Sequence, residues 1–301
     1  MSKVSIYIPT KNRSELVRRA INSALNQDYK DLEVIVVDDG STDDTPNMLQ
    51  AMKGQDPRLV VLRNEISQGP QRARNTAIRS SSGDFVTGLD DDDEFSDGRI
   101  SCLLQGWSLF TKYESNVSGV YAQDIYVVDG LEVGRSHKKG SMGFSDFPQT
   151  NHVGNQIFAP RNHYLDVGLF DESMPAWQDM ELFVRMAKRF GPAKLVDLYL
   201  YRYDVTPSPD RISKSEYKVR DACRRIGLKH YEDRPIDQQR FMFHLFEDHY
   251  GFVPRWSDLV ELNRLKASPT GTLRLLRKMI FNGRIIHRAG RKKVGVSPLP
   301  R

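Results

Sequence analysis

The sequence predicts an α/β protein built on a mostly parallel sheet. Over the first 95 residues, short apolar and β-branched runs alternate with helical patterns of about a dozen residues, which is typical of right-handed βαβ units. The run LEVIVVDD at 32–39 is apolar along most of its length, as expected of a strand buried on both faces of a parallel sheet. With 39% apolar and 28% charged residues among 301, the composition is that of an ordinary globular protein.

A strand, a helix and a second strand are expected first. VSIYIP at 4–9 is apolar and β-branched, so it predicts a strand. Apolar residues at helical spacing then predict a helix over 14–27, with Ser14 as its N-cap. Together with the run at 32–39, these segments form the first βαβ unit.

The same pattern then repeats. GSTDDTPNMLQAMKG at 40–54 predicts a turn and a helix, with Thr45 as the cap and Pro46 at the first helical position. The next strand, helix and strand are predicted at 58–64, 69–81 and 83–90.

The rest of the chain divides into three stretches. Residues 117–175 combine short strand-like pieces with loops, 176–190 has a clear helical pattern, and residues beyond about 205 are polar and helical in pattern. We therefore predict an α/β domain at 1–205 and a helical C-terminal extension at 206–301.

Charge is distributed unevenly. The residues from Arg264 to Arg301 contain 11 Lys and Arg and no Asp or Glu, whereas the preceding residues hold 33 of the 44 basic residues and all 39 acidic ones. A whole-chain pI of about 9.1 therefore does not describe the body, and we predict no nucleic-acid partner.

The basic tail is also amphipathic. Leu273, Leu276 and Ile280 alternate there with basic residues, namely Arg274, Arg277, Lys278, Arg284 and Arg288. Such a segment suits an anionic membrane surface, and a helix that packs on the body is the alternative. No apolar run approaches the roughly 18 residues of a membrane-spanning helix. With Cys102 and Cys223 as reduced thiols, we predict a cytoplasmic protein, peripheral on the inner membrane.

Polar sequences follow three of the predicted strands: PTKNR, DDGS and DDDD. Ligands of parallel sheets bind beyond the carboxyl ends of the strands, so these sequences should meet at one edge. The glycine-rich dinucleotide signature and the Walker Gly-Lys-Ser/Thr loop are both absent. This edge is therefore expected to bind its ligand in another way.

The most unusual of these sequences is the acidic run Asp90–Asp93, within FVTGLDDDDEF. Carboxylates this close repel one another unless a cation neutralises them, and a solvated acidic turn is the alternative. Oxygen ligands suit Mg²⁺ or Mn²⁺, but an EF-hand loop fails because Phe95 would stand at the third position of the loop, where an oxygen ligand belongs. A site with few protein carboxylates suits a metal that phosphates also hold, which indicates a diphosphate ligand.

Two further sequences carry candidate ligand contacts. Asp38 and Asp39 end the second strand, where a carboxylate can accept a hydrogen bond from the edge of uracil or guanine. A turn at the start of a helix is the alternative, but it explains only the capping residues that follow these two aspartates. Arg74 and Asn75 follow the start of a predicted helix and could reach a phosphate or a ribose, and a surface helix face is the alternative.

The helix at 176–190 places Asp179 on its apolar face, near its start. Glu181 and Arg185 form an i,i+4 pair that we expect on the polar face. Asp179 either complements the positive end of the helix or acts as a general base beside Trp177, and the pattern leaves both open.

These features in this order resemble the bacterial family 2 glycosyltransferases of the GT-A fold. The likeness runs from Val4 to about Arg202 and is carried by five segments: VSIYIPTKNR, EVIVVDDGSTDDT, GPQRARNTAI, GDFVTGLDDDDEF and VGLFDESMPAWQDMELFVRMA. The resemblance implies inverting transfer of a sugar from a nucleotide sugar, UDP-linked, to a hydroxyl of a lipid-linked glycan acceptor in surface polysaccharide synthesis. It also implies Mn²⁺ or Mg²⁺ as cofactor.

The resemblance implies roles for individual residues. Asp39 would contact the base, Asp92 would bind the metal directly, and Asp90 would face the ribose or the metal. Asp179 matches the base that deprotonates the acceptor, although Gln178 stands where the family often has an acid. Other residues implied at the nucleotide are Pro9, Thr10, Asn12, Arg13, Arg74 and Asp91. On the acceptor side we predict His152, Asn155 and Trp177, and a structural role is the alternative for each of them.

Two other functions stay open from the sequence. A sugar-nucleotide pyrophosphorylase would share the sheet and the metal, but it needs a glycine-rich loop after the first strand, and PTKNRSE has no glycine. A non-enzymatic metal- or nucleotide-binding domain of flavodoxin-like type would explain Asp38 and Asp39, but it leaves the acidic run and Asp179 unexplained.

Overall fold

The computed structural model describes residues 2–206, 215–247 and 250–289, with side chains as far as Ile280. The chain separates into two compact units. The α/β unit comprises Met1–Phe144, Asn151–Ser173 and Gln178–Pro207. The helical unit comprises Ser145–Thr150, Met174–Trp177 and Ser208–Arg301.

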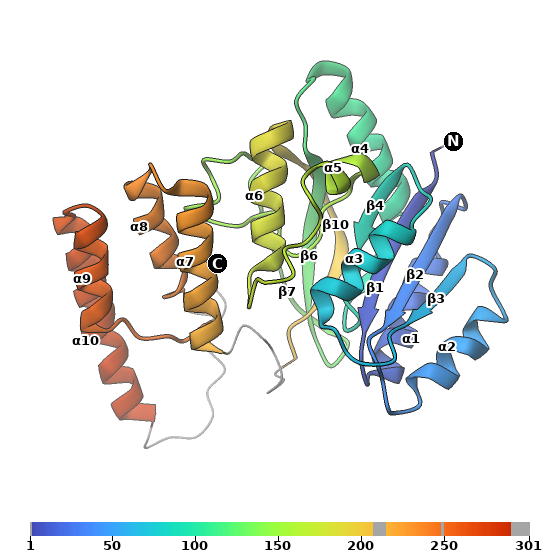
Figure 1. The fold of residues 1–301 in the computed structure, drawn as a ribbon, viewed down its shortest axis with the longest axis horizontal. Coiled ribbons are helices and arrows are strands. Elements are labelled where there is room, and N and C mark those ends of the chain that lie inside the picture. The colour runs from blue at the N-terminus through green and yellow to red at the C-terminus, as the bar shows by residue number, and fades with distance from the viewer. Residues whose placement is uncertain (1, 207–214, 248–249, 290–301) are drawn as a thin grey trace. The chain divides into compact units, whose positions relative to one another are not determined.

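The first sheet of the α/β unit has the strand order β3-β2-β1-β4-β9 (Figure 1). The strands β1 to β4 are mutually parallel, whereas β9 is antiparallel to β4. Their bounds are β1 (Val4–Thr10), β2 (Leu32–Asp38), β3 (Leu59–Arg63), β4 (Phe85–Gly88) and β9 (Ala159–Pro160). This sheet confirms the predicted α/β class, and β1 and β2 are buried throughout, as their apolar sequences require.

The helices that connect these strands are α1 (Ser14–Leu25), α2 (Thr45–Lys53) and α3 (Pro70–Ser80). The capping predictions were wrong by one residue. Ser14 and Thr45 are the first helical residues, and Arg13 and Asp44 stand at the N-cap positions without a capping side-chain hydrogen bond. Arg13 points its guanidinium at the acidic run.

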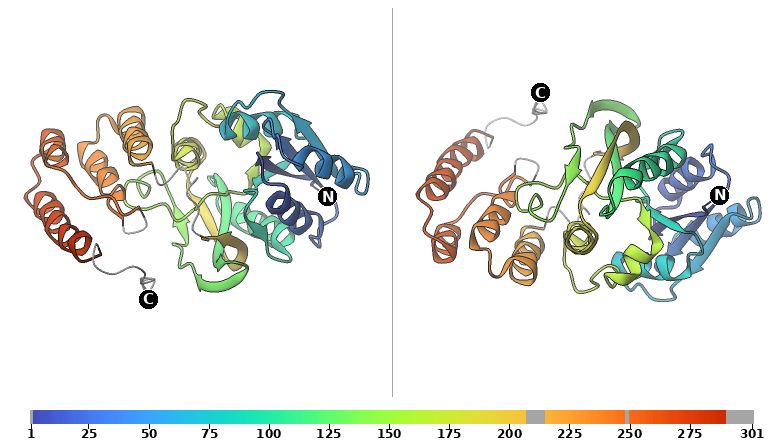
Figure 2. Two further views of the ribbon diagram at one scale, coloured as in Figure 1. Left: turned by 90° about the horizontal axis from the view of Figure 1, so that it is seen from below. Right: turned by 90° about the horizontal axis from the view of Figure 1, so that it is seen from above.

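The second sheet of this unit has the order β5-β10-β6-β7, and β8 pairs with β10. Its strands are β5 (Glu94–Phe95), β6 (Gly119–Val128), β7 (Leu131–Arg135), β8 (Ser141–Met142) and β10 (Ala193–Asp204). The accompanying helices are α4 (Arg99–Tyr113), α5 (Arg161–Asp166) and α6 (Gln178–Phe190). Helices α1 and α4 lie next to each other (Figure 2), and the Ile100 amide donates to Gln27 Oε1 at 3.2 Å.

Helix α6 differs from its sequence prediction in one respect. The Glu181–Arg185 pair forms as predicted, with 2.6 Å between Glu181 Oε2 and Arg185 Nη2, but it does not lie on a polar face. Glu181 is fully buried, and Arg185 also donates to the carbonyl oxygens of Val167 and Leu169. The pair therefore joins α6 to the segment that follows α5.

We expect Glu181→Gln to lower the free energy of unfolding by about 3 kcal/mol, because it leaves the charge of Arg185 without its buried partner. Chemical denaturation measures this loss. Glu15→Gln is the matched control, since Glu15 is 80% exposed, and it should change stability by less than about 0.5 kcal/mol. Equal stability of the two variants would contradict a structural role for the buried pair.

The described part of the helical unit contains α7 (Glu216–Tyr231), α8 (Pro235–His244), α9 (Trp256–Leu265) and α10 (Pro269–Ala289). Leu262 of α9 and Leu275 of α10 are fully buried, so α10 packs within this unit. Cys223 of α7 and Cys102 of the other unit are free thiols. Among the described residues, every helix is too short or too polar to cross a membrane.

Candidate active site

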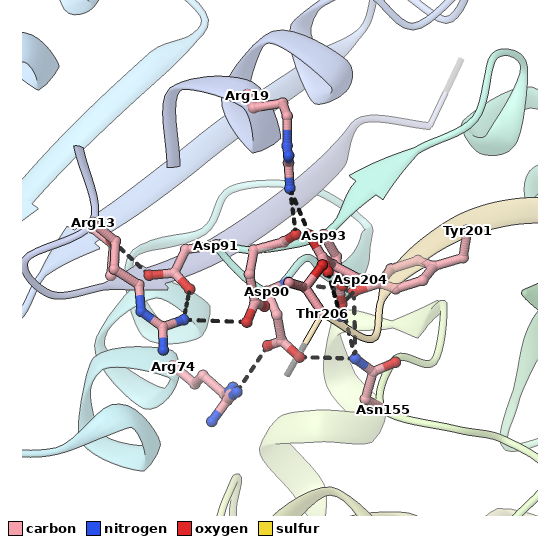
Figure 3. Close-up of polar contacts among 12 residues, drawn as sticks. Arg13, Arg19, Arg74, Asp90, Asp91, Asp93, Asn155, Tyr201, Asp204 and Thr206 are labelled. Atoms are coloured by element: carbon pink, nitrogen blue, oxygen red, sulfur yellow. Dashed lines mark hydrogen bonds and ion pairs between the residues drawn. The ribbon is translucent and has the colours of Figure 1, made fainter. Parts of the chain in front are cut away.

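The acidic run follows β4 at the carboxyl edge of the first sheet, beside the end of β1 (Figure 3). Gly88 ends β4, and a Cβ atom there would lie 1.9 Å from Gln156 Oε1 and 2.4 Å from the Tyr7 ring. Only glycine fits between these side chains. Strand β4 ends at this residue, and the four aspartates follow past the end of the strand.

Arg13 holds the middle of the run. Its Nη1 donates to Asp91 Oδ1 at 2.8 Å and to Asp92 Oδ2 at 3.3 Å. Thr10, the last residue of β1, donates its hydroxyl to Asp91 Oδ2 at 2.8 Å. Burial raises the pKa of Asp91 to about 6, and Arg13 opposes this rise while Asp92 adds to it.

Asp90 and Asp93 have different partners. Asp90 pairs with Arg74 at 2.9 Å and accepts from Asn155 Nδ2 at 2.8 Å. Asp93 is buried, and it accepts from the Tyr201 hydroxyl at 2.7 Å and from the Asp204 amide at 2.8 Å. Burial raises the pKa of Asp93 well above its usual range, and the nearby charges of Asp92 and Asp90 raise it further.

The chain's own groups therefore offset much of the repulsion among these carboxylates. Arg13 and Arg74 supply positive charge, while hydroxyl, amide and backbone donors satisfy other carboxylate oxygens. Asp92 has the most exposed carboxylate among the three that pair with arginine, at 29% against 22% for Asp90 and 10% for Asp91. Of these three, it is thus the most accessible to a ligand.

Asp39 is buried at the end of β2, and its carboxylate anchors the loop before α3. It accepts from the side chains of Asn64 and Ser67, both at 2.7 Å, and from the backbone amides of Gln68 and Gly69, both at 2.8 Å. Burial would raise the pKa of Asp39, but these four hydrogen bonds outweigh it and lower the pKa. A nucleobase could donate to this carboxylate only if one of the two side-chain donors moved away.

Asn12 and Pro9, both predicted at the nucleotide, have mainly structural surroundings. Asn12 has a left-handed backbone with φ of 54°, its amide donates to Ser41 Oγ, and its Oδ1 accepts from the Thr42 amide, each at 2.8 Å. Pro9 is buried in β1, opposite Val37 of β2. Asn12 therefore joins the loops after β1 and β2.

Arg74 lies at the centre of the site. It is only 6% exposed, and its guanidinium lies 5.6 Å from the centre of the Phe170 ring. One nitrogen donates to Asp90, while Nε and Nη1 are buried without a hydrogen-bond partner among the described residues. Asn75, in contrast, donates to the Phe170 carbonyl and accepts from its amide, so it fixes the backbone there.

Asp179 faces Arg74 and Asp90 from the first turn of α6. Its Oδ1 is buried and has no hydrogen-bond partner among the described residues. Burial raises the pKa of Asp179 to about 7, with Arg74 lowering it and Asp90 raising it further. A carboxyl that titrates near neutral pH and has a free oxygen is suited to general-base catalysis.

The three acceptor-side predictions have different environments. Asn155 contacts the acidic run directly, which its sequence position did not suggest. His152 is partly buried in the same segment. Trp177 belongs to the helical unit, where its Nε1 donates to the Tyr250 hydroxyl at 2.6 Å.

The comparisons with known sequences agree on the class of protein. The family model described as glycosyl transferase family 2 matches residues 5–137. WcaA of Escherichia coli K12, named as a putative glycosyl transferase of colanic acid biosynthesis, is 35% identical over 193 residues, covering 62% of this chain and 67% of WcaA. The GalNAc(5)-diNAcBac-PP-undecaprenol β-1,3-glucosyltransferase of Campylobacter jejuni is 46% identical over 106 residues, covering 35% of this chain and 34% of that enzyme.

Solved structures share the fold at low sequence identity. Staphylococcus aureus TarS, residues 1–349 with UDP-GlcNAc, has a TM-score of 0.62 at 18% identity, and the match covers 96% of this chain and 91% of TarS 1–349. The mannosyltransferase PcManGT of Pyrobaculum calidifontis, with GDP-Man and Mn²⁺, has a TM-score of 0.57 at 17% identity, and the match covers 97% of this chain and 76% of PcManGT.

The sheet topology and the similarity to these solved structures define the GT-A fold. The chain spans two thirds of WcaA at 35% identity and also matches the family model. It belongs to glycosyltransferase family 2. The family assignment agrees with the resemblance noted in the sequence.

Proposed function

We propose that the domain at 1–205 transfers a sugar from a UDP-linked donor to a hydroxyl of a lipid-linked glycan, with inversion, in bacterial surface polysaccharide synthesis. Relatives support the reaction class, since one is named for colanic acid biosynthesis and another for an undecaprenol-linked acceptor. The TarS complex with UDP-GlcNAc supports a nucleotide-sugar donor. The same names favour sugar transfer over a pyrophosphorylase or a non-enzymatic binding domain.

One observation carries the proposal: two complementary groups with unused hydrogen-bonding capacity lie together at the edge of the sheet. Arg74 offers buried N–H groups, and Asp179 offers a buried carboxylate oxygen. Buried polar atoms without partners are uncommon in folded proteins, and they are typical of sites that a ligand completes. Arg74 suits the oxygens of a diphosphate, and Asp179 suits the hydroxyl proton of an acceptor.

The nucleotide would lie along the ends of β1, β2 and β4. Asp39 would accept from the base after the side chain of Asn64 or Ser67 gives up its hydrogen bond, while the Gln68 and Gly69 amides keep the carboxylate in place. Thr10 and Arg13 would support this end of the site through Asp91.

The acidic run fits a divalent cation that takes most of its ligands from a bound diphosphate and water. Among the described side chains, no group of three or more His, Cys, Asp or Glu residues is arranged to hold a metal ion. Carboxylate oxygens from Asp92 and Asp90 suit Mn²⁺ or Mg²⁺ when a diphosphate and water supply the other ligands. Such a cation would neutralise charge on the leaving diphosphate, which is Lewis-acid assistance.

Sugar transfer then requires one displacement. Asp179 takes the proton from the acceptor hydroxyl, whose oxygen forms a bond to the anomeric carbon as the bond from that carbon to the diphosphate oxygen breaks. UDP leaves with the electron pair, and Arg74 stabilises its growing negative charge. Attack from the face opposite the leaving group turns an α-linked donor into a β-glycoside.

The test is a transfer assay with the full-length protein. A thermal-shift series of nucleotide sugars with Mn²⁺ selects the donor, and the chosen donor is then incubated with undecaprenyl-diphosphate-linked sugars. A β-linked product, identified by NMR, supports the proposal. Stabilisation by a nucleotide sugar without any transfer or hydrolysis would favour a binding domain.

We also propose that the protein is cytoplasmic and meets the membrane through α10. Leu273 and Ile280 are 50% and 54% exposed, and Arg277 between them is exposed too. The side chains of Arg284 and Arg288 and residues 290–301 lie outside the described part of the chain.

We expect Leu273→Ser with Ile280→Ser to weaken binding to phosphatidylglycerol vesicles about tenfold. Each side chain is already about half buried, so insertion of the rest contributes about 0.7 kcal/mol per side chain. Two such contributions make about 1.4 kcal/mol, which is tenfold in affinity. Vesicle co-sedimentation measures this change. Leu131→Ser is the control, since Leu131 is 74% exposed on β7 of the α/β unit. Unchanged binding by the double variant would remove the proposed membrane contact.

A further inference from the structure

Asn155 bridges two carboxylates of the acidic run. Its Nδ2 donates to Asp90 Oδ2 at 2.8 Å and to Asp93 Oδ2 at 3.3 Å, and it lies 3.4 Å from the Tyr201 hydroxyl (Figure 3). An amide nitrogen has two hydrogens, so it can serve both carboxylates at once. One uncharged group thus separates two acids that would otherwise face each other.

A buried ion pair holds the backbone next to Asn155. Lys138 Nζ lies 2.7 Å from Asp124 Oδ1, and the two side chains are 8% and 11% exposed. Lys138 Nζ also donates to the Ala122 carbonyl at 2.8 Å and reaches the Val153 carbonyl at 3.5 Å. The ammonium therefore lies between β6 and the segment that leads to Asn155.

The turn before Asn155 is built for this close approach. Gly154 has φ of 87°, and a Cβ atom there would lie 3.1 Å from Lys138 Nζ. Asn151 closes the turn, because its Nδ2 donates to the Gly154 carbonyl at 2.9 Å and its Oδ1 accepts from the Gly154 amide at 3.3 Å. Lys138 and Asn151 thus both hold the backbone just before Asn155.

Lys138 is fixed in its turn by the hairpin that carries it. Its amide donates to Gln123 Oε1 at 2.9 Å, and the same oxygen accepts from the Ser136 hydroxyl at 2.8 Å. Ser136 also exchanges hydrogen bonds with the backbone of Asp124. Polar contacts therefore link β6 to the segment before Asn155, and Asn155 itself contacts the acidic run.

We propose that Asn155 is a positioning residue for the donor-binding carboxylates, held in register by the buried Lys138–Asp124 pair. Asp90 is the carboxylate affected most, since Arg74 binds its Oδ1 and Asn155 its Oδ2, so that both oxygens have a defined direction. The inference rests on the proposed function, because it assigns Asn155 to the metal- and nucleotide-binding end of that site and not to the acceptor end.

The test compares Asn155→Leu with the wild-type chain. Leucine has the same number of heavy atoms and the same branching at Cγ, and it removes both N–H donors. Titration calorimetry should show UDP affinity in the presence of Mn²⁺ about 10- to 100-fold weaker, the loss typical of residues that orient metal ligands. UDP affinity in EDTA should stay within about twofold, because the effect acts through the carboxylates. Asn22→Leu, on α1, is the matched control and should match the wild type in both conditions.

A second variant tests the support of Asn155. Lys138→Met with Asp124→Asn removes the ion pair without leaving one charge buried, and it should lose the same Mn²⁺-dependent affinity as Asn155→Leu. Combining all three substitutions should cause no further loss, because they act on one arrangement. Full Mn²⁺-dependent affinity in Asn155→Leu overturns the proposal. A wild-type chain that binds UDP but transfers no sugar would instead count against the proposed function.

Discussion

Asp179→Asn is expected to lower kcat for sugar transfer by about 10³-fold, within the range that removal of a general base produces. Asparagine keeps the shape of the side chain but cannot accept the acceptor's proton. UDP binding should change little, because Asp90, Arg74 and Asp39 are untouched. Product formation measures the first effect, and calorimetric titration with UDP measures the second.

The control for this variant is Asp166→Asn, a carboxyl at the end of α5 that should keep full activity. Asp179→Asn with wild-type transfer and unchanged stability would contradict the assignment of Asp179 as the base. Loss of both transfer and UDP binding would indicate a structural role for Asp179.

The pH dependence of the wild type and Asp179→Asn gives an independent measurement. Burial raises the pKa of Asp179 to about 7, so wild-type kcat/KM should rise with pH up to that value and then level off. The folded chain holds this proton between about pH 4 and 7, whereas the unfolded chain has lost it, so stability falls as pH rises through this window. Asp179→Asn should therefore be more stable than the wild type at pH 8, and the gain should largely vanish at pH 4 to 5.

The sequence predicted those parts of the fold and site that local patterns determine. Continuous apolar runs indicated β1 and β2, and the rule that ligands lie beyond strand ends correctly placed Thr10, Asp39 and Asp90 at one edge of the sheet. The start of α6 was also recognisable, and with it the position of Asp179. These predictions needed only periodicity and topology.

Contacts between distant segments could not be read in the same way. The helical pattern placed Glu181 on a polar face, but the carbonyls of Val167 and Leu169 approach Arg185 and bury the pair. Asn155 lies 65 residues from Asp90 in the chain, so no local pattern links them. Its only local signal is the preceding Gly154, whose left-handed backbone indicates a tight turn.

Asp92→Ala is expected to abolish the gain in UDP affinity that Mn²⁺ provides. Asp92 is the most exposed of the three aspartates that pair with arginine, and Arg13, which lies 3.3 Å from it, can keep its 2.8 Å bond to Asp91 when a cation takes the Asp92 carboxylate. The wild type should bind UDP on the order of 10²-fold more tightly with Mn²⁺ than with EDTA. The variant should bind equally in both, and calorimetry measures the difference.

Comparing Asp92→Ala with Asn155→Leu distinguishes a direct metal ligand from a residue that only orients the ligands. Removal of a direct ligand should leave a site that high Mn²⁺ cannot restore, whereas loss of orientation should only shift the Mn²⁺ concentration that UDP binding requires. Asp44→Ala, an exposed carboxyl before α2, is the control and should keep the full Mn²⁺ effect. If Asp92→Ala also kept it, Asp92 would be no metal ligand, and the cation would have to be held by Asp90 and the diphosphate.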